Sequence, residues 1–394
     1  MGPRLHRQDL LDHLGARVSG DQGETFADEL RSNTGGESKV IGISVKDRGA
    51  ISMAGHSGTA YWFSKAGGEF VTSTYYLDQY PDWVNVFNAT KPAQQFAGTE
   101  WQLLHDRDTY LFGDSDDRPW ETDVGGFGRT FPHSFGDGTS PYFTTWLTLS
   151  PPGDRLVLDF AKQALLGEQL GQDDVTDYLA VSFSSTDYVG HVFGPSSLEA
   201  EDNILRLDRA LAELFAFVDE KVGLDNTLIV LSADHGGPDT PGYLNGLNIP
   251  AGYVNPNSWD RDAAIARIKK QFRIKGDLIA AYDHPYVYFS DEVKNDGGID
   301  QAALEATVVE ELMKFHGVSL AVSSSALRPW TGVRSRAASS RVRPQPTIKN
   351  GSGKPSLRYK LNRAGISFLE VKSPVAPIIT IVQGSLGSGT MHSL

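Results

Sequence analysis

Residues 179–195, LAVSFSSTDYVGHVFGP, join a short apolar run directly to a carboxylate and an imidazole. The first seven residues have the length and composition of a buried β-strand, and no polar loop separates them from Asp187 and His191. Two other runs have the same character, KVIGISV at 39–45 and TLIVLSA at 227–233. These three runs are the strands from which we predict the fold.

Segments with helical periodicity precede and follow the strand that begins at residue 179. Apolar residues recur at helical spacing over 155–169, and one apolar stripe runs along 199–221. The alternation of buried strands with helices implies parallel strands joined by crossover helices. The sequence therefore predicts an α/β fold with a mostly parallel central sheet flanked by helices.

The chain of 394 residues is long enough for one large domain with an insertion. Residues 61–150 are rich in aromatic residues, Gly and Pro, and we expect an irregular cap or insertion there. The composition changes near residue 326, because residues 321–394 hold eleven Lys and Arg but a single acidic residue, Glu370. We predict a domain over 1–325 and a basic tail over 326–394. The tail is either a disordered extension or a segment translated in a shifted reading frame.

Composition also limits the partners and the kinds of site. The net charge of −13 argues against a nucleic acid as a structural partner. No apolar run is long enough to span a membrane, and the N-terminal residues lack the apolar segment of a signal peptide. Cysteine is absent, so any bound metal must be held by Asp, Glu and His.

The three predicted strands end in residues that can bind a cation or a phosphate. In a parallel α/β sheet, ligands bind at the carboxyl ends of the strands, so the three ends would converge at one edge. Six side chains follow the strands at this edge: Lys46, Arg48, Asp187, His191, Asp234 and His235. Each pair alone is more often a turn or a solvated loop, but their joint occurrence favours a functional site.

The chemistry of these side chains suits a metal ion and a phosphate group. Carboxylate oxygen and neutral imidazole nitrogen bind zinc, manganese or iron, and Asp187 with His191 one turn later can chelate one ion. Asp234 and His235 could bind a second ion. Two metal ions can stabilise both the attacking and the leaving oxygen of a phosphoryl transfer. Lys46 and Arg48, two apart, would share a side of an extended chain and could hold non-bridging phosphate oxygens.

These segments, together with AYWFSKAGGEFVTSTYY and WVNVFNA, resemble the alkaline phosphatase superfamily over about residues 22–325. The resemblance is to periplasmic alkaline phosphatases of the PafA type, and also to nucleotide pyrophosphatase/phosphodiesterases. It implies two zinc ions, a Thr or Ser nucleophile and hydrolysis of small phosphate monoesters through a covalent phospho-enzyme. It also implies that Asp187 and His191 hold one zinc, that Asp234 and His235 belong to the other, and that Lys46-x-Arg48 contacts the phosphate.

The sequence departs from the family pattern at both ends. The segments that carry the family's first metal-binding Asp and its nucleophile are not found upstream of residue 39, so we expect the N-terminal part of the domain to be missing. Thr186 should not be taken as the nucleophile, which stays unknown. The family's last His ligand has a single candidate, His392, within the basic tail.

Three readings of function follow from the resemblance. The first is a metal-dependent phosphomonoesterase of alkaline phosphatase type, inactive as given if the nucleophile segment is missing. The second is a phosphodiesterase, nucleotide pyrophosphatase or sulfatase relative. The third is a non-catalytic remnant that binds metal. The family is exported, which implies a periplasmic or secreted protein although this chain shows no signal peptide.

Overall fold

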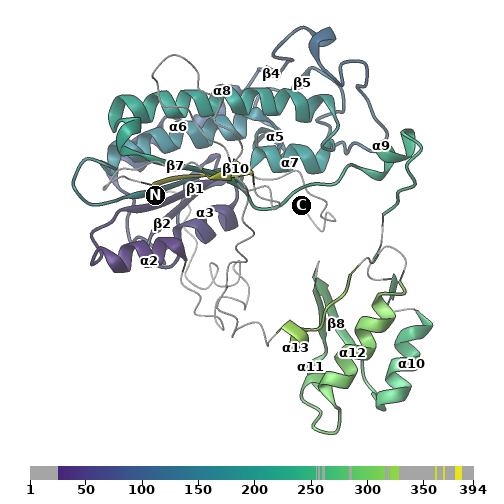
Figure 1. Ribbon diagram of the computed structural model, residues 1–394. Coiled ribbons are helices and arrows are strands. Elements are labelled where there is room, and N and C mark those ends of the chain that lie inside the picture. Colours follow the sequence, from purple (N-terminus) through teal and green to yellow (C-terminus); the bar gives the residue numbers. More distant parts are fainter. Residues whose placement is uncertain are drawn as a thin grey trace, which may run out of the picture. The chain divides into compact units, whose positions relative to one another are not determined.

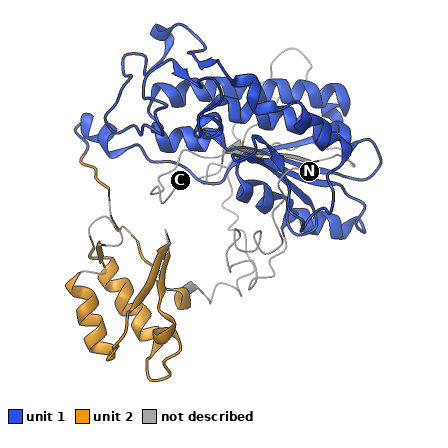
Figure 2. Cartoon of the chain, turned by 180° about the vertical axis from the view of Figure 1, so that it is seen from behind, with its two compact units in different colours: residues 1–249, 356–394 blue, residues 250–355 orange. Residues whose placement is uncertain are grey.

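The computed structural model describes most of the chain between residues 25 and 327 and three short strands beyond it (Figure 1). The described residues are 25–253, 255, 258–259, 262–283, 286–315, 318 and 320–327, with the backbone of 360–361, 367–368 and 378–383. The chain forms two compact units. The first consists of residues 1–249 with 356–394, and the second of residues 250–355 (Figure 2).

An eight-stranded sheet organises the first unit, in the order β10-β11-β7-β12-β6-β1-β2-β3. The pairings from β7 through β12, β6 and β1 to β2 are parallel, whereas the outer pairings are antiparallel. The strands are β1 (Val40–Ser44), β2 (Thr59–Ser64), β3 (Glu69–Val71), β6 (Tyr178–Phe183), β7 (Leu228–Ala233), β10 (Lys360–Leu361), β11 (Ser367–Phe368) and β12 (Ile378–Gln383). The predicted α/β class with a mostly parallel sheet is confirmed, and the three predicted strands are β1, β6 and β7.

Helices cover the sheet on both faces (Figure 1). On one side lie α2 (Phe26–Asn33) and α3 (Asp47–Ala54). On the other side α6 (Pro151–Gly167) and α8 (Leu198–Lys221) run along the sheet, and they correspond to the two predicted helices. Two shorter helices, α5 (Phe143–Thr148) and α7 (Ser185–Val192), lie at the end of the sheet where α8 begins.

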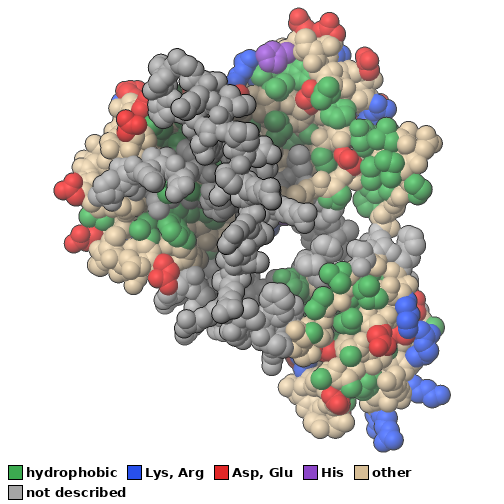
Figure 3. All heavy atoms as spheres, viewed as in Figure 1, with side chains coloured by type: hydrophobic (Ala, Val, Ile, Leu, Met, Phe, Trp, Pro, Cys, Tyr) green, Lys and Arg blue, Asp and Glu red, His purple; other side chains and the backbone are tan. Residues whose placement is uncertain are grey.

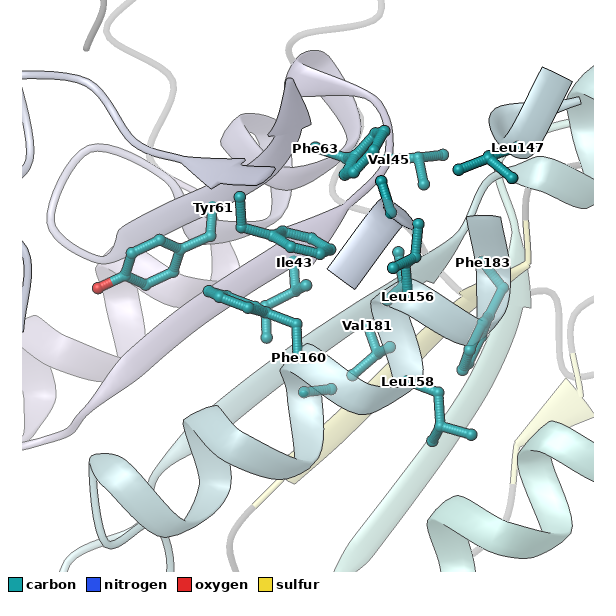
Figure 4. Packing of buried hydrophobic residues seen from close by; sticks show 14 of the residues in the cluster. Ile43, Val45, Tyr61, Phe63, Leu147, Leu156, Leu158, Phe160, Val181 and Phe183 are labelled. Atoms are coloured by element: carbon teal, nitrogen blue, oxygen red, sulfur yellow. The ribbon is translucent and has the colours of Figure 1, made fainter. Parts of the chain in front are cut away.

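The main hydrophobic core lies between the sheet and α6 (Figure 4). Phe160 of α6 is fully buried, and its ring stacks on Phe70 with centroids 4.1 Å apart and an interplanar angle of 11°. Tyr61 and Trp83 contact the same ring at 5.3 and 5.1 Å. These aromatic contacts fix α6 against β2 and β3, which positions the start of α6 near the carboxyl edge of the sheet.

Residues 61–150 contain sheet strands at their start and mostly short elements afterwards. After β3 come α4 (Asp82–Ala89), η1 (Pro92–Phe96), β4 (Glu100–Trp101), η2 (Arg107–Thr109) and β5 (His133–Ser134). This irregular segment is held by Asp202 of α8, whose buried carboxylate accepts hydrogen bonds from Trp101 Nε1 at 2.6 Å, Leu104 N at 2.7 Å and Tyr110 Oη at 2.6 Å. The hydrogen bonds to the Asp202 carboxylate thus stabilise a segment that has little regular secondary structure of its own.

The second unit has a core of its own. It contains α10 (Ala263–Phe272), the antiparallel pair β8 (Ile279–Asp283) and β9 (Tyr286–Phe289), α11 (Asp291–Lys294), α12 (Gln301–Leu312) and α13 (Ser324–Leu327). Trp259, Ile268 and Leu304 are buried in it. On the face shown in Figure 3, Lys and Arg side chains gather at the border of this unit.

The boundaries of the two compact units differ from the predicted domain boundaries. The predicted limits, 1–325 and 326–394, stay a prediction, but the structure starts its second unit at Pro250. It also places β10, β11 and β12 within the predicted tail, with β12 between β6 and β7. None of the helices in the described part of the chain combines the length and hydropathy that crossing a bilayer requires.

Candidate active site

The three predicted clusters follow strands that end at one edge of the sheet. Ser44 of β1 pairs in parallel register with Ser182 of β6. Gln383 of β12 pairs with both Phe183 of β6 and Ala233 of β7. The segments after β1, β6 and β7 therefore leave the sheet on the same side, as the sequence predicted.

Helix α7 gives Asp187 and His191 a common face. It begins two residues after β6 and spans Ser185–Val192, which places the two side chains one turn apart. Asp187 is 2% exposed, and its Oδ1 atom lies 3.3 Å from His191 Nε2. That oxygen is buried and has no hydrogen-bond partner among the described residues.

The segment after β7 brings a second imidazole to the same oxygen. His235 Nε2 lies 3.6 Å from Asp187 Oδ1 and also 3.6 Å from Asp234 Oδ2. His235 Nδ1 lies 3.2 Å from the carbonyl oxygen of Gly236, and only the protonated nitrogen can donate to a carbonyl. This tautomer, assigned from the hydrogen bond, leaves a lone pair on Nε2, the form in which imidazole binds a metal.

Lys46 places an ammonium group on the other oxygen of Asp187. Lys46 Nζ forms an ion pair with Asp187 Oδ2 and lies 4.3 Å from the ring centroid of Tyr188. The Lys46 side chain is 10% exposed. Burial lowers the pKa of Lys46 more than the charge of Asp187 raises it. Burial alone would raise the pKa of Asp187, but His191 and Lys46 outweigh burial and hold it below its usual value.

The expected geometry of Lys46 and Arg48 is wrong in one respect. They were expected to share a side of an extended chain, but α3 begins at Asp47, so only Lys46 has an extended backbone. Arg48 lies in the first helical turn and is exposed. Asp47 supports this turn, because it places a negative charge at the positive end of the helix and accepts a hydrogen bond from Arg48 N at 2.7 Å.

Two buried polar clusters that sequence reasoning missed support this edge. Asp154 of α6 accepts a hydrogen bond from Ser185 N at 3.0 Å and another from Thr186 Oγ1 at 3.2 Å. It thereby caps α7, whose own N-cap residue, Ser184, makes no side-chain capping bond. Burial raises the pKa of Asp154 to about 7. Thr186 also accepts from Asn203 Nδ2 at 2.9 Å, so its hydroxyl has a structural role.

The second cluster is a chain of serine hydroxyls. Ser184 Oγ lies 2.9 Å from Ser44 Oγ and 2.6 Å from Ser182 Oγ, and Ser44 Oγ accepts from Lys46 N at 3.0 Å. These contacts tie the segment that carries Lys46 to the segment that carries Asp187. Ser44 and Ser182 lie within the apolar strands VIGIS and YLAVSF, and this is the feature of the sequence from which the serine cluster could have been predicted. No local pattern in the sequence predicts that Asp154 caps α7.

The side chains at this edge are of the types that bind metal ions. A buried carboxylate oxygen without a hydrogen-bond partner faces two imidazole nitrogens, which are ligand types that zinc prefers. Lys46 supplies positive charge to the same carboxylate. Within the described ranges, no group of three or more Asp, Glu or His side chains is assembled as a metal site. His392 lies outside the described residues.

The mostly parallel sheet flanked by helices is the fold of the alkaline phosphatase superfamily of hydrolases. Residues 20–314 match the family described as type I phosphodiesterase / nucleotide pyrophosphatase, and the chain belongs to this family.

Relatives in this family include named phosphatases. The chain is 38% identical over 301 residues to alkaline phosphatase PhoV of Synechococcus elongatus, covering 76% of this chain and 54% of PhoV. It is 38% identical over 304 residues to alkaline phosphatase PafA of Elizabethkingia meningoseptica, covering 76% and 55%. It thus spans about half the length of these relatives.

Solved structures of PafA have the same fold. The crystal structure of the wild-type enzyme superimposes with a TM-score of 0.66 at 35% sequence identity, covering 78% of this chain and 58% of PafA. A PafA variant with four substitutions superimposes with a TM-score of 0.65 at 38% identity, covering 74% of this chain and 56% of the variant.

Proposed function

We propose that the chain carries the metal and phosphate site of a hydrolase that cleaves phosphate monoesters, of alkaline phosphatase type with two zinc ions. One observation carries this proposal: Lys46, His191 and His235 approach a single buried carboxylate, Asp187, at the carboxyl edge of the sheet. The naming of several relatives as alkaline phosphatases supports it.

The metal-binding roles are divided between two segments. Asp187 and His191 would hold one zinc ion, and Asp234 and His235 would belong to the other, with His392 as a further candidate ligand. When bound, zinc lowers the pKa of an oxygen nucleophile and stabilises the leaving oxygen. The nucleophile stays unassigned.

Lys46 and Arg48 would bind the non-bridging oxygens of the phosphate. Their charges stabilise the negative charge of the transferred group, and the Arg guanidinium can donate two parallel hydrogen bonds. The substituted PafA variant also carries replacements of a lysine and an arginine two residues apart, the same types at the same spacing. This supports a shared role for the pair.

A phosphodiesterase is the second candidate, because the matched family is described by diester and pyrophosphate cleavage. The two are separated by the rates at which the zinc-loaded chain hydrolyses p-nitrophenyl phosphate and bis-p-nitrophenyl phosphate. We expect the unmodified chain to hydrolyse the monoester faster than the diester. Lys46→Ala should lose this preference, and Lys39→Ala should keep it. Lys39 is the matched control because it precedes the same strand at its opposite end. Diester preference in the unmodified chain would refute the monoester proposal.

The third reading, a metal-binding remnant, predicts bound zinc without turnover of either ester. A small phosphate ester is the proposed partner in the other two cases. The family resemblance supports a periplasmic or secreted location as part of the proposal. Detection of the protein in the cytoplasmic fraction alone would contradict that location.

A further inference from the structure

A second lysine follows the strand next to β1 at the same edge of the sheet. β2 ends at Ser64 and runs parallel to β1, with Trp62 paired to Ser44, so Lys65 leaves the sheet beside the segment that carries Lys46. Across the sheet, the segments after β7, β6, β1 and β2 carry His235, Asp187, Lys46 and Lys65 in that order. Lys65 thus lies on the side of Lys46 away from the proposed metal ligands.

The ring of Tyr188 joins the two lysines. Lys46 Nζ lies 4.3 Å and Lys65 Nζ lies 5.2 Å from its centroid. Both ammonium groups are within the range of an attractive cation–π contact, and Tyr188 directly follows Asp187. The backbone of Lys65 is fixed as well, because its carbonyl oxygen accepts a hydrogen bond from Thr144 Oγ1 at 2.7 Å. The Lys65 ammonium therefore lies against the same ring as the Lys46 ammonium.

The charge of Lys65 is poorly compensated. Its side chain is half-buried and forms no ion pair within the part of the chain that the structure describes. Burial lowers the pKa of Lys65, the charge of Lys46 lowers it further, and Asp47 acts in the opposite direction. A solvated surface lysine would show neither the burial nor the second cation beside it. A half-buried ammonium in this position is stabilised when an anion binds.

We propose that Lys65 binds a second anionic group, a carboxylate or a phosphate, on the leaving group of the substrate. This inference rests on the proposed phosphate site and adds a preference, among phosphate monoesters, for those whose leaving group carries an additional negative charge. In this proposal Lys46 and Arg48 hold the phosphate that is cleaved, and Lys65, one strand further from the proposed metal ligands, is left for the second anionic group. Lys65 is a specificity-determining residue in this account.

The test measures binding of two non-hydrolysable ligands, phenylphosphonate and 4-carboxyphenylphosphonate, by titration calorimetry on the full zinc-loaded chain. We expect the carboxylated ligand to bind about tenfold more tightly, as one charge-assisted contact provides. Lys65→Met should abolish the difference and leave phenylphosphonate affinity unchanged, and Lys65→Arg should restore it. Lys39→Met is the control, and a thermal melt of each variant verifies folding.

The outcomes separate the two proposals. If phenylphosphonate binds but the carboxylate gives no advantage, or Lys65→Met keeps the advantage, the role of Lys65 is wrong while the phosphate site stands. If phenylphosphonate does not bind to the unmodified chain, the phosphate site and the inference built on it both fail.

Discussion

Replacement of Lys46 by Met tests the centre of the site, because it removes the ammonium group from a buried ion pair and keeps an unbranched apolar side chain only one atom shorter. The Lys46 and Asp187 side chains are 10% and 2% exposed, so water cannot replace the lost charge. Breaking a buried pair by removing one partner costs about 3–5 kcal/mol. Because Lys46 keeps some exposure, we expect a loss of about 3 kcal/mol in the free energy of unfolding of the metal-free chain.

The assay is urea denaturation with zinc removed by a chelator and again with zinc present. Lys39→Met is the control, since Lys39 is 31% exposed and pairs at 3.0 Å with Asp173, which is 47% exposed. Its second partner, the buried Asp177, lies further away at 3.8 Å and keeps two backbone hydrogen bonds without the ammonium, so the loss should be about 1 kcal/mol. Zinc should reduce the effect of Lys46→Met, because a bound cation also compensates Asp187. A metal-free loss no larger than that of Lys39→Met would refute the buried-pair reasoning.

Three further predictions concern the surrounding structure. Phe160→Ala should lower the free energy of unfolding by about 3–5 kcal/mol in urea, whereas Leu166→Ala, at a position 45% exposed in the same helix, should cost under about 1 kcal/mol; equal losses would contradict the packing. Burial, and then the charge of Glu199, raise the pKa of Glu121 from 4.5 to about 8. The folded chain therefore keeps a proton that the unfolded chain has lost, and stability falls between pH 4.5 and 8 by up to about 1.4 kcal/mol per pH unit. Glu121→Gln should remove that part of the slope, and an unchanged slope would show that Glu121 does not titrate in this range. Asp154→Ala should increase amide hydrogen exchange in α7, whereas Asp177→Ala, which removes a buried acceptor at the other end of β6, should not; equal exchange in α7 would contradict the capping role of Asp154.

The sequence predicts the part of the fold that depends on short-range patterns. β1, β6 and β7 are recognisable because buried parallel strands are continuous apolar runs, and α6 and α8 because their apolar faces recur at helical spacing. The convergence of Lys46, Asp187 and His235 also follows, since parallel strands place their carboxyl ends at one edge.

The remaining features depend on contacts between distant segments, for which the sequence has no local pattern. Asp154 caps a helix 31 residues further along the chain, and Asp202 holds loops about a hundred residues before it. Lys65 could not be singled out, because its relation to Lys46 depends on the order of the strands and on the ring of Tyr188. The helical position of Arg48 has no clear local signal, because Lys46, the residue at the N-cap of α3, makes no side-chain capping hydrogen bond.

The most direct test of the proposed site is the zinc content of the full chain and of Asp187→Ala after equilibrium dialysis against zinc. Asp187 has the buried oxygen that both imidazoles approach, so it is the side chain on which the site depends most. The account predicts up to two zinc ions per chain, with at least one lost in Asp187→Ala. Equal zinc content in the two proteins would contradict it.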